Sequence, residues 1–231
     1  MDITPTETSQ SVTATAVQQA LAQIATPGSE GQTHGKPRLP PGSPEWRRTV
    51  LGLQESHHPK VQLAAECAER FIRSCLRDIR DGGTWFAVSG QTGCGKTHLA
   101  KRLANYYDTR IIDAWHRGWI RDDNVSSSVF LDWPKVASAK DWVFDDIVEN
   151  ELYNARFVII DDIGAESDRY KSGEPATRLL RVLNRLEKKW LFVTTNVAPS
   201  MWRETFDQRI ADRLLGGAYV SMFEVPSWRT K

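Results

Sequence analysis

A glycine-rich stretch, residues 84–99 (TWFAVSGQTGCGKTHL), constrains the fold of this chain more than any other segment. Its apolar start, residues 85–88, predicts a buried strand. The strand leads into Gly90-x-x-x-x-Gly95-Lys96-Thr97, and a helix is predicted from near Lys96. Because the strand before the glycines and the helix after them are both present, a phosphate-binding loop is favoured over a chance turn.

Each residue type in this loop suits a polyphosphate. Gly90, Gly93 and Gly95 let consecutive backbone N–H groups bend inward around a phosphate, and the helix N-terminus adds partial positive charge. Lys96 can bridge the β- and γ-phosphates, and the Thr97 hydroxyl can ligate Mg²⁺.

A second apolar run, residues 157–160, ends in two carboxylates. In open α/β sheets, ligands bind at the carboxyl ends of the strands. Asp161 is therefore expected to hold the Mg²⁺ shell, and Asp162 to orient or deprotonate an attacking water; Glu166 is an alternative base. Asn196 follows a further buried strand, residues 190–193, where its amide can reach the γ-phosphate or the water.

The composition limits the class of protein but does not indicate a binding partner. The 231 residues, 40% hydrophobic and 26% charged, suit one globular domain with an appendage. A net charge of +1 neither demands nor excludes nucleic acid, so any such contact needs a local patch. The three cysteines lack metal-ligand spacing, which favours a reduced, cytoplasmic setting. No stretch approaches the roughly 20 apolar residues of a membrane span, and no secretory signal is found.

The chain divides into a tail, residues 1–44, and a nucleotide-binding domain, residues 45–231. Residues 11–25 could form a short helix, and the dense Pro and Gly residues of 26–44 mark a linker. The helix could be a docking peptide for a partner, or the tail could be inert; both interpretations stay open.

The remaining periodicity predicts an α/β fold, a three-layer sandwich around a mostly parallel sheet. Further helices are expected after Ser43, at 60–80, from Lys96 to about Tyr107, and at 141–154, 174–189 and 203–215. Further strands are expected at 110–113, 129–133 and 218–225.

Two surface features allow a nucleic-acid interpretation. Arg178, Arg181, Arg185 and Lys188 or Lys189 recur at helical spacing, which suits either a phosphate backbone or a solvated face. Trp115 and Trp119 could stack bases, or fold an insertion at 114–128 against the core.

Arg209 and Arg213 are four residues apart and share a helix face. An arginine from a neighbouring subunit can stabilise charge on a transferring phosphoryl group. Pairing with Asp207 or Asp212 is the alternative, and the sequence does not separate the two.

With GQTGCGKTHLA, FVIIDDIGAE, LFVTTN and RIADRL in that order, residues 60–230 resemble AAA+ ATPases, and more narrowly the DnaC-type helicase loaders and IstB-type transposition helpers. The resemblance implies a P-loop NTPase core without a C-terminal lid, using ATP and Mg²⁺. It implies nucleotide contacts from Gly90, Gln91, Thr92, Gly93, Cys94, Gly95, Lys96, Thr97 and His98. It implies catalytic roles for Lys96, Asp161, Asp162 and Asn196, with Thr97 and Asp161 holding the metal, and Arg213, or else Arg209, acting in trans.

The resemblance also implies partners. Such proteins assemble with their own copies when ATP is bound, grip DNA, here more readily single-stranded, and act on a replicative helicase or a transposase. Many AAA+ proteins carry Glu where this chain has Asp162, and the shorter side chain predicts slow hydrolysis. A helicase loader is the first hypothesis. A transposition helper and a nucleotide-dependent binding module with negligible turnover are the alternatives.

Overall fold

The computed structural model describes residues 43–54, 57–77, 83–118, 127–166 and 173–228. The predicted helix at 11–25 and most of the linker lie outside these ranges. The described strands form one parallel sheet in the order β2-β3-β4-β1-β5. They are β1 Trp85–Ser89, β2 Val129–Asp132, β3 Phe157–Ile163, β4 Trp190–Thr195 and β5 Ala218–Ser221.

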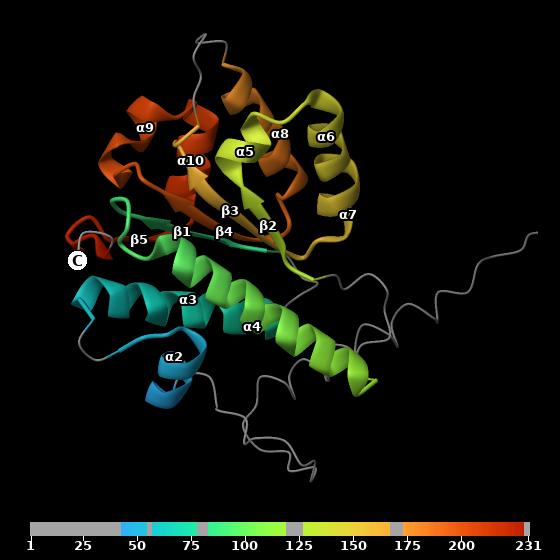
Figure 1. Cartoon of the computed structure of the whole chain (residues 1–231). Helices are drawn as coiled ribbons and strands as arrows, with labels where there is room; N and C mark the ends of the chain where they lie inside the picture. Colours follow the sequence, from blue (N-terminus) through green and yellow to red (C-terminus); the bar gives the residue numbers. More distant parts are fainter. Residues whose placement is uncertain (1–42, 55–56, 78–82, 119–126, 167–172, 229–231) are drawn as a thin grey trace, which may run out of the picture.

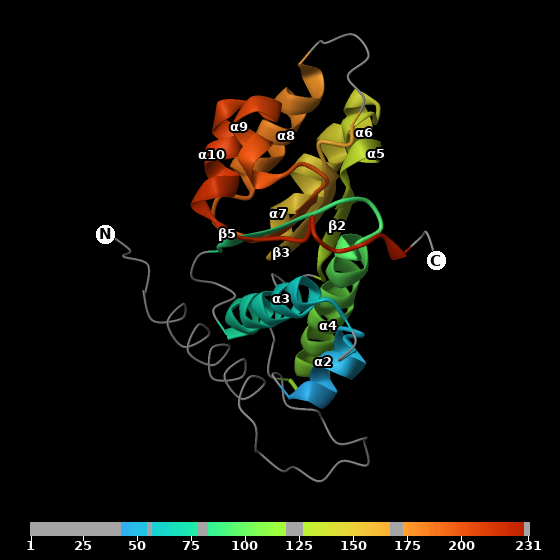
Figure 2. The ribbon, with the colours of Figure 1, turned by 90° about the vertical axis from the view of Figure 1, so that its left-hand side faces the viewer.

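Helices cover both faces of the sheet, which confirms the predicted three-layer sandwich (Figures 1 and 2). One face carries α2 Pro44–Val50, α3 Pro59–Arg77 and α4 Lys96–His116. The other carries α5 Trp133–Ala137, α6 Asp141–Asp146, the π-helix η1 Ile147–Glu151, α7 Leu152–Asn154, α8 Glu174–Arg185, the 3₁₀ turn η2 Pro199–Met201, α9 Trp202–Thr205 and α10 Gln208–Gly216. Each face of the sheet accordingly has its own apolar core.

The central strands are apolar because both of their faces are covered. Residues 157–161 of β3 and all of β4 are buried. The strand order places the carboxyl ends of β1, β4 and β3 side by side. This edge of the sheet carries the glycine-rich loop, the two predicted acidic residues Asp161 and Asp162, and the predicted amide of Asn196.

The strand predicted at Arg110–Asp113 is wrong, because these residues continue α4 to His116. Ile111 and Ala114 are buried on the same helix face as Tyr107, whereas Ile112 is 51% exposed. The apolar pair has a high β propensity, but packing of one helix face against the sheet overrides it.

The helix predicted at 203–215 is interrupted. Phe206 is extended, and Asp207 begins a new helix, α10, by accepting a hydrogen bond from the backbone N–H of Arg209 at 2.9 Å. The local side-chain cap thus competes successfully with helix continuation. None of the helices in the described part of the chain combines the length and apolar character that crossing a bilayer requires.

Candidate functional site

The glycine-rich loop connects β1 to the N-terminus of α4, as its sequence predicts. Gly95 lies at the helix N-cap with φ of 100°, a conformation that side-chain-bearing residues rarely adopt. At Gly90, an added Cβ would lie 2.8 Å from the Cys94 Sγ atom and 3.0 Å from Met222. Glycine is therefore required for backbone conformation at one position and for close packing at the other.

Lys96 is buried and its ammonium group faces the loop. Its Nζ atom donates to the Gly90 carbonyl at 2.8 Å, the Gln91 carbonyl at 3.1 Å and the Asn196 Oδ1 atom at 2.8 Å. The first turn of α4 thus brings a cation to the carboxyl end of β4.

Asp161 connects the loop to β3. Its Oδ1 atom accepts hydrogen bonds from the Thr97 hydroxyl at 3.2 Å and the Thr194 hydroxyl at 2.6 Å. Burial raises the pKa of the Asp161 carboxyl, and the hydrogen bonds from Thr194 and Thr97 oppose this shift. An arriving cation would favour the charged form of this carboxylate.

Asp162 lies beside the amide of Asn196, whose Nδ2 atom donates to the Asp162 Oδ1 atom at 3.3 Å. The Asp162 backbone has φ of 62° and is the single non-glycine residue with positive φ among those that the structure describes. The Glu166 side chain instead accepts from the Gly164 N–H at 2.6 Å.

The donor set around Thr97 and Asp161 fits Mg²⁺, which takes oxygen ligands and usually keeps phosphate and water in its shell. Within the described ranges, no three or more His, Cys, Asp or Glu residues gather as a self-sufficient metal site. A metal here would depend on phosphate oxygens, and it would offset negative charge on them.

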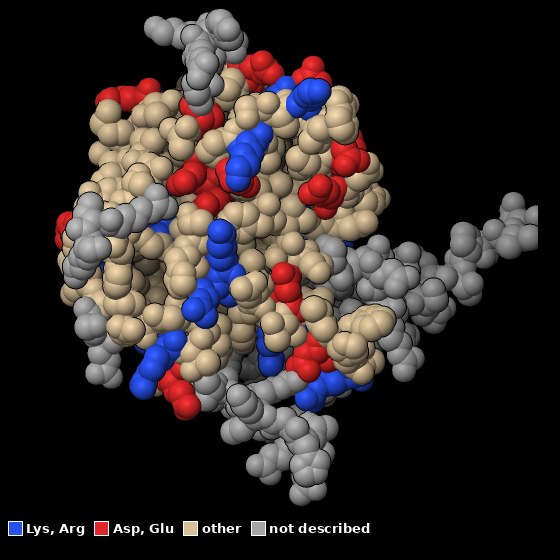
Figure 3. All heavy atoms as spheres, viewed as in Figure 1, with Lys and Arg blue, Asp and Glu red and all other residues tan. Residues whose placement is uncertain are grey.

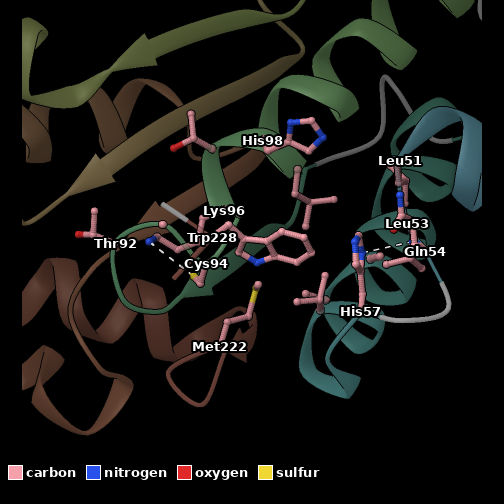
Figure 4. Close-up of a pocket in the computed structure, with 18 of the residues that line it drawn as sticks. Leu51, Leu53, Gln54, His57, Thr92, Cys94, Lys96, His98, Met222 and Trp228 are labelled. Carbon is pink, nitrogen blue, oxygen red and sulfur yellow. Dashed lines mark hydrogen bonds between the residues drawn. The ribbon is translucent and has the colours of Figure 1, made fainter. Parts of the chain in front are cut away.

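A cavity of about 520 Å³ opens beside the loop (Figure 4). The predicted contacts from Thr92 to His98 line it, together with Asp162 and Asn196. Gly90 and Gln91 are not among the lining residues, and the Gln91 side chain donates to the Val225 carbonyl instead.

The opposite wall was not predicted from sequence. It comes from residues 51–54, His57 and the start of α3, and from Met222 and Trp228 near the end of the described chain. The Trp228 indole lies edge-on to the His57 imidazole with ring centroids 4.7 Å apart, and the backbone N–H of Trp228 donates to the Gly93 carbonyl at 3.0 Å. Figure 4 shows the indole directed into the cavity.

Two imidazoles flank this wall. The pKa of His57 is lowered by partial burial and by the nearby His98. The pKa of His98 is lowered by partial burial and by the charge of Arg102. Neutral imidazoles and an indole suit a flat, uncharged ring, whereas the loop suits phosphates.

Several solved structures share this architecture. DnaA from Aquifex aeolicus with bound AMPPCP matches with a TM-score of 0.52 and 18% identity, over 76% of this chain and 50% of that one. The DnaC helicase loader matches with a TM-score of 0.50 and 16% identity, over 78% of this chain and 99% of that one. DnaI matches with a TM-score of 0.50 and 18% identity, over 75% and 93%.

The chain has the AAA+ fold. It spans about half the length of the DnaA structures and nearly all of the DnaC structure. No protein-family model and no curated protein matches the sequence.

The two arginines predicted to act in trans do not line the cavity. Arg209 pairs with Asp207 at 3.1 Å and is well exposed. Arg213 donates from Nη2 to the Asn184 side chain at 2.7 Å, and its Nη1 atom has no hydrogen-bond partner in the described part of the chain. Arg213 is thus held by a neutral group and Arg209 by a charged one.

The basic stripe on α8 is engaged within the domain. Arg178 is buried and pairs with Glu174 at 2.7 Å and with Asp141, and Arg181 pairs with Asp145 and Glu149. On the face shown in Figure 3, basic and acidic side chains are interspersed. These ion pairs favour a structural role for the stripe over a nucleic-acid role.

The structure also describes two other residues that were considered for nucleic-acid contact, Lys189 and Trp115. Lys189 donates to the backbone carbonyls of Leu152 and Tyr153, and burial lowers its pKa to about 8. Trp115 is 61% exposed at the end of α4, and its predicted companion Trp119 lies outside the described residues.

Proposed function

We propose that this protein binds and hydrolyses ATP and uses it to assemble on DNA and load or remodel a replicative helicase. One observation carries the proposal: Lys96 and Thr97 of the phosphate loop line one cavity, and the Thr97 hydroxyl donates to the carboxylate of Asp161 in β3. The AMPPCP bound in DnaA supports a nucleoside triphosphate as the ligand.

In this proposal, the loop N–H groups and Lys96 hold the phosphates, and Thr97 and Asp161 hold Mg²⁺. Asp162 and Asn196 orient the attacking water, with the shorter aspartate giving slow turnover. The His57 and Trp228 wall contacts the base. Arg213, rather than Arg209, is assigned to the ATP of a neighbouring copy. Its hydrogen bond to the neutral Asn184 side chain is easier to exchange for a phosphate than the ion pair of Arg209 with Asp207.

A helicase is proposed as the partner because the match to the DnaC helicase loader covers nearly the whole length of that structure. Single-stranded DNA is proposed because one of the matched DnaA structures contains single-stranded DNA. Replication proteins among the matched structures favour a loader over a transposition helper. We place the protein in the cytoplasm, with residues 45–231 as the ATP-binding domain and 1–44 as a tail. Removing the tail tests whether it holds the helicase.

The first test measures a fluorescent ATP analogue binding to the full chain with and without Mg²⁺. We expect binding by the wild type and at least about a tenfold loss in Lys96→Ala, because a charge-assisted contact to phosphate is removed. Lys101→Ala, on an exposed position of the same helix, is the matched control and should bind normally. Absence of binding by the wild type would refute the proposal.

The second test measures ATP hydrolysis with single-stranded DNA, duplex DNA, a replicative helicase and a transposase, each added separately. Stimulation by single-stranded DNA or helicase supports a loader. ATP binding without turnover under every condition would instead identify a nucleotide-dependent binding module. Stimulation by a transposase alone would favour a transposition helper.

A further inference from the structure

We propose that Thr194 is a positioning residue that holds the Asp161 carboxylate and the Asp162 backbone through its single hydroxyl group. The inference rests on the proposed function, since it concerns how the ATP site is held in a working geometry. Thr194 lies in β4, is fully buried, and points toward β3 rather than into the cavity.

The hydroxyl makes two hydrogen bonds of opposite sense. It donates to the Asp161 Oδ1 atom at 2.6 Å, and it accepts from the Asp162 backbone N–H at 2.9 Å. A hydroxyl is suited to this place because it donates and accepts through one atom. Neither valine nor alanine could replace either bond.

The bond to Asp162 lies where the strand is irregular. The pairing of β3 with β4 shifts between Ile160 and Ile163, and Asp162 has φ of 62°. Left-handed backbone is unfavourable for a residue with a side chain, so it persists where surrounding contacts impose it. The Thr194 hydroxyl supplies one of these contacts by taking the Asp162 N–H.

The bond to Asp161 fixes its carboxylate. Thr97 and Thr194 both donate to the Asp161 Oδ1 atom, which holds the carboxyl plane between the phosphate loop and β4. Partners that orient metal-holding groups in this way typically contribute 10- to 100-fold to affinity or activity (an order-of-magnitude guide). Thr194 therefore couples the position expected to hold the metal to the position expected to orient water.

The neighbouring Thr195 provides a matched control. It is also fully buried in β4 and also makes two hydrogen bonds, donating to the Ile163 carbonyl at 2.8 Å and accepting from the Val197 N–H at 3.1 Å. Its partners are backbone groups alone, so Thr195→Val removes equivalent bonds without touching a carboxylate.

The experiment compares Thr194→Val, Thr194→Ser and Thr195→Val in the full chain. Affinity for a fluorescent ATP analogue is measured in Mg²⁺ and in EDTA, and the rate of single-turnover hydrolysis is measured in Mg²⁺. In Thr194→Val we expect loss of the Mg²⁺-dependent gain in affinity and about a 10- to 100-fold fall in hydrolysis rate, with affinity in EDTA retained.

Thr194→Ser keeps the hydroxyl and should restore both the Mg²⁺ effect and the hydrolysis rate. Thr195→Val should keep the wild-type Mg²⁺ effect, even if thermal stability falls equally in the two valine variants. The inference is overturned if the wild type shows the Mg²⁺ effect and Thr194→Val shows it undiminished, or if Thr195→Val reproduces every change. Failure of the wild type to bind nucleotide would instead overturn the proposed function, and this inference with it.

Discussion

The Lys96 ammonium group and the Asn196 side-chain oxygen lie 2.8 Å apart although the residues are separated by 100 positions in the chain. The same amide donates to Asp162 through its nitrogen atom at 3.3 Å. Asn196 therefore connects the cation of the phosphate loop to the carboxylate proposed to orient water.

Asn196→Ala should lower the hydrolysis rate more than the nucleotide affinity. The variant leaves the loop intact, but it removes a polar group beside the proposed attacking water, a loss of about 10²-fold for a comparable donor in other active sites. Single-turnover rates and equilibrium binding measure the two effects separately. Asn105→Ala, on an exposed position of α4, is the control and should match the wild type. Equal loss of rate and affinity would show that Asn196 acts in binding alone.

Asp161→Asn should stabilise the domain while abolishing Mg²⁺-dependent binding. Burial raises the pKa of the Asp161 carboxyl, so its neutral form favours the folded state. That stabilising contribution is complete below the unfolded pKa and is lost as pH rises through the raised folded pKa. The uncharged amide avoids this loss.

The measurement is thermal unfolding in EDTA from about pH 8 down to the acid range, below the ordinary carboxyl pKa near 4. The variant should unfold at a higher temperature than the wild type at neutral pH, with each 1 kcal/mol raising Tm by about 2–4 °C. The difference should shrink on acidification. A constant difference at all pH values would mean that the carboxyl charge is not its source.

Part of this site can be predicted from the sequence, and part of it cannot. Gly90 to Thr97 form one contiguous pattern, Asp161 ends an apolar run within β3, and Asn196 directly follows β4, so local signals locate them. The sequence carries no comparable signal for Thr194 or Trp228. The role of Thr194 depends on the pairing of β4 with β3, and that of Trp228 on the return of the chain to the glycine-rich loop. At Ile111 and Ile112, local β propensity pointed to the wrong element, since the deciding factor was packing of α4 on the sheet.

If Arg213 acts in trans, Arg213→Ala should abolish most ATP hydrolysis while leaving nucleotide affinity near the wild-type value. Arg209→Ala should have a weaker effect, because the Arg209 side chain is paired with Asp207 within the same subunit. Loss of an arginine that stabilises the transferring phosphoryl group typically costs about 10³-fold or more.

Mixing inactive variants gives the decisive readout for this prediction. Arg213→Ala keeps Lys96, and Lys96→Ala keeps Arg213, so some interfaces in a mixture contain both groups from different subunits. Activity should partly recover on mixing and should follow the ATP-dependent mass in sedimentation. An inactive mixture of variants that still associate would contradict action in trans.

Trp228 should contribute to nucleotide affinity, since its indole points into the cavity and its backbone is joined to Gly93 at 3.0 Å. Stacking of a base on an aromatic ring is worth about 1–3 kcal/mol, so Trp228→Ala should weaken ATP binding by roughly 5- to 150-fold. Trp228→Phe should retain most of the affinity. Trp142→Ala removes a tryptophan that is 71% exposed on the opposite face of the sheet, and it should bind as the wild type does. Comparing ATP with inorganic triphosphate locates the effect: a contact to the base leaves triphosphate binding unchanged in Trp228→Ala, whereas equal weakening of both ligands would show that the residue supports the loop instead.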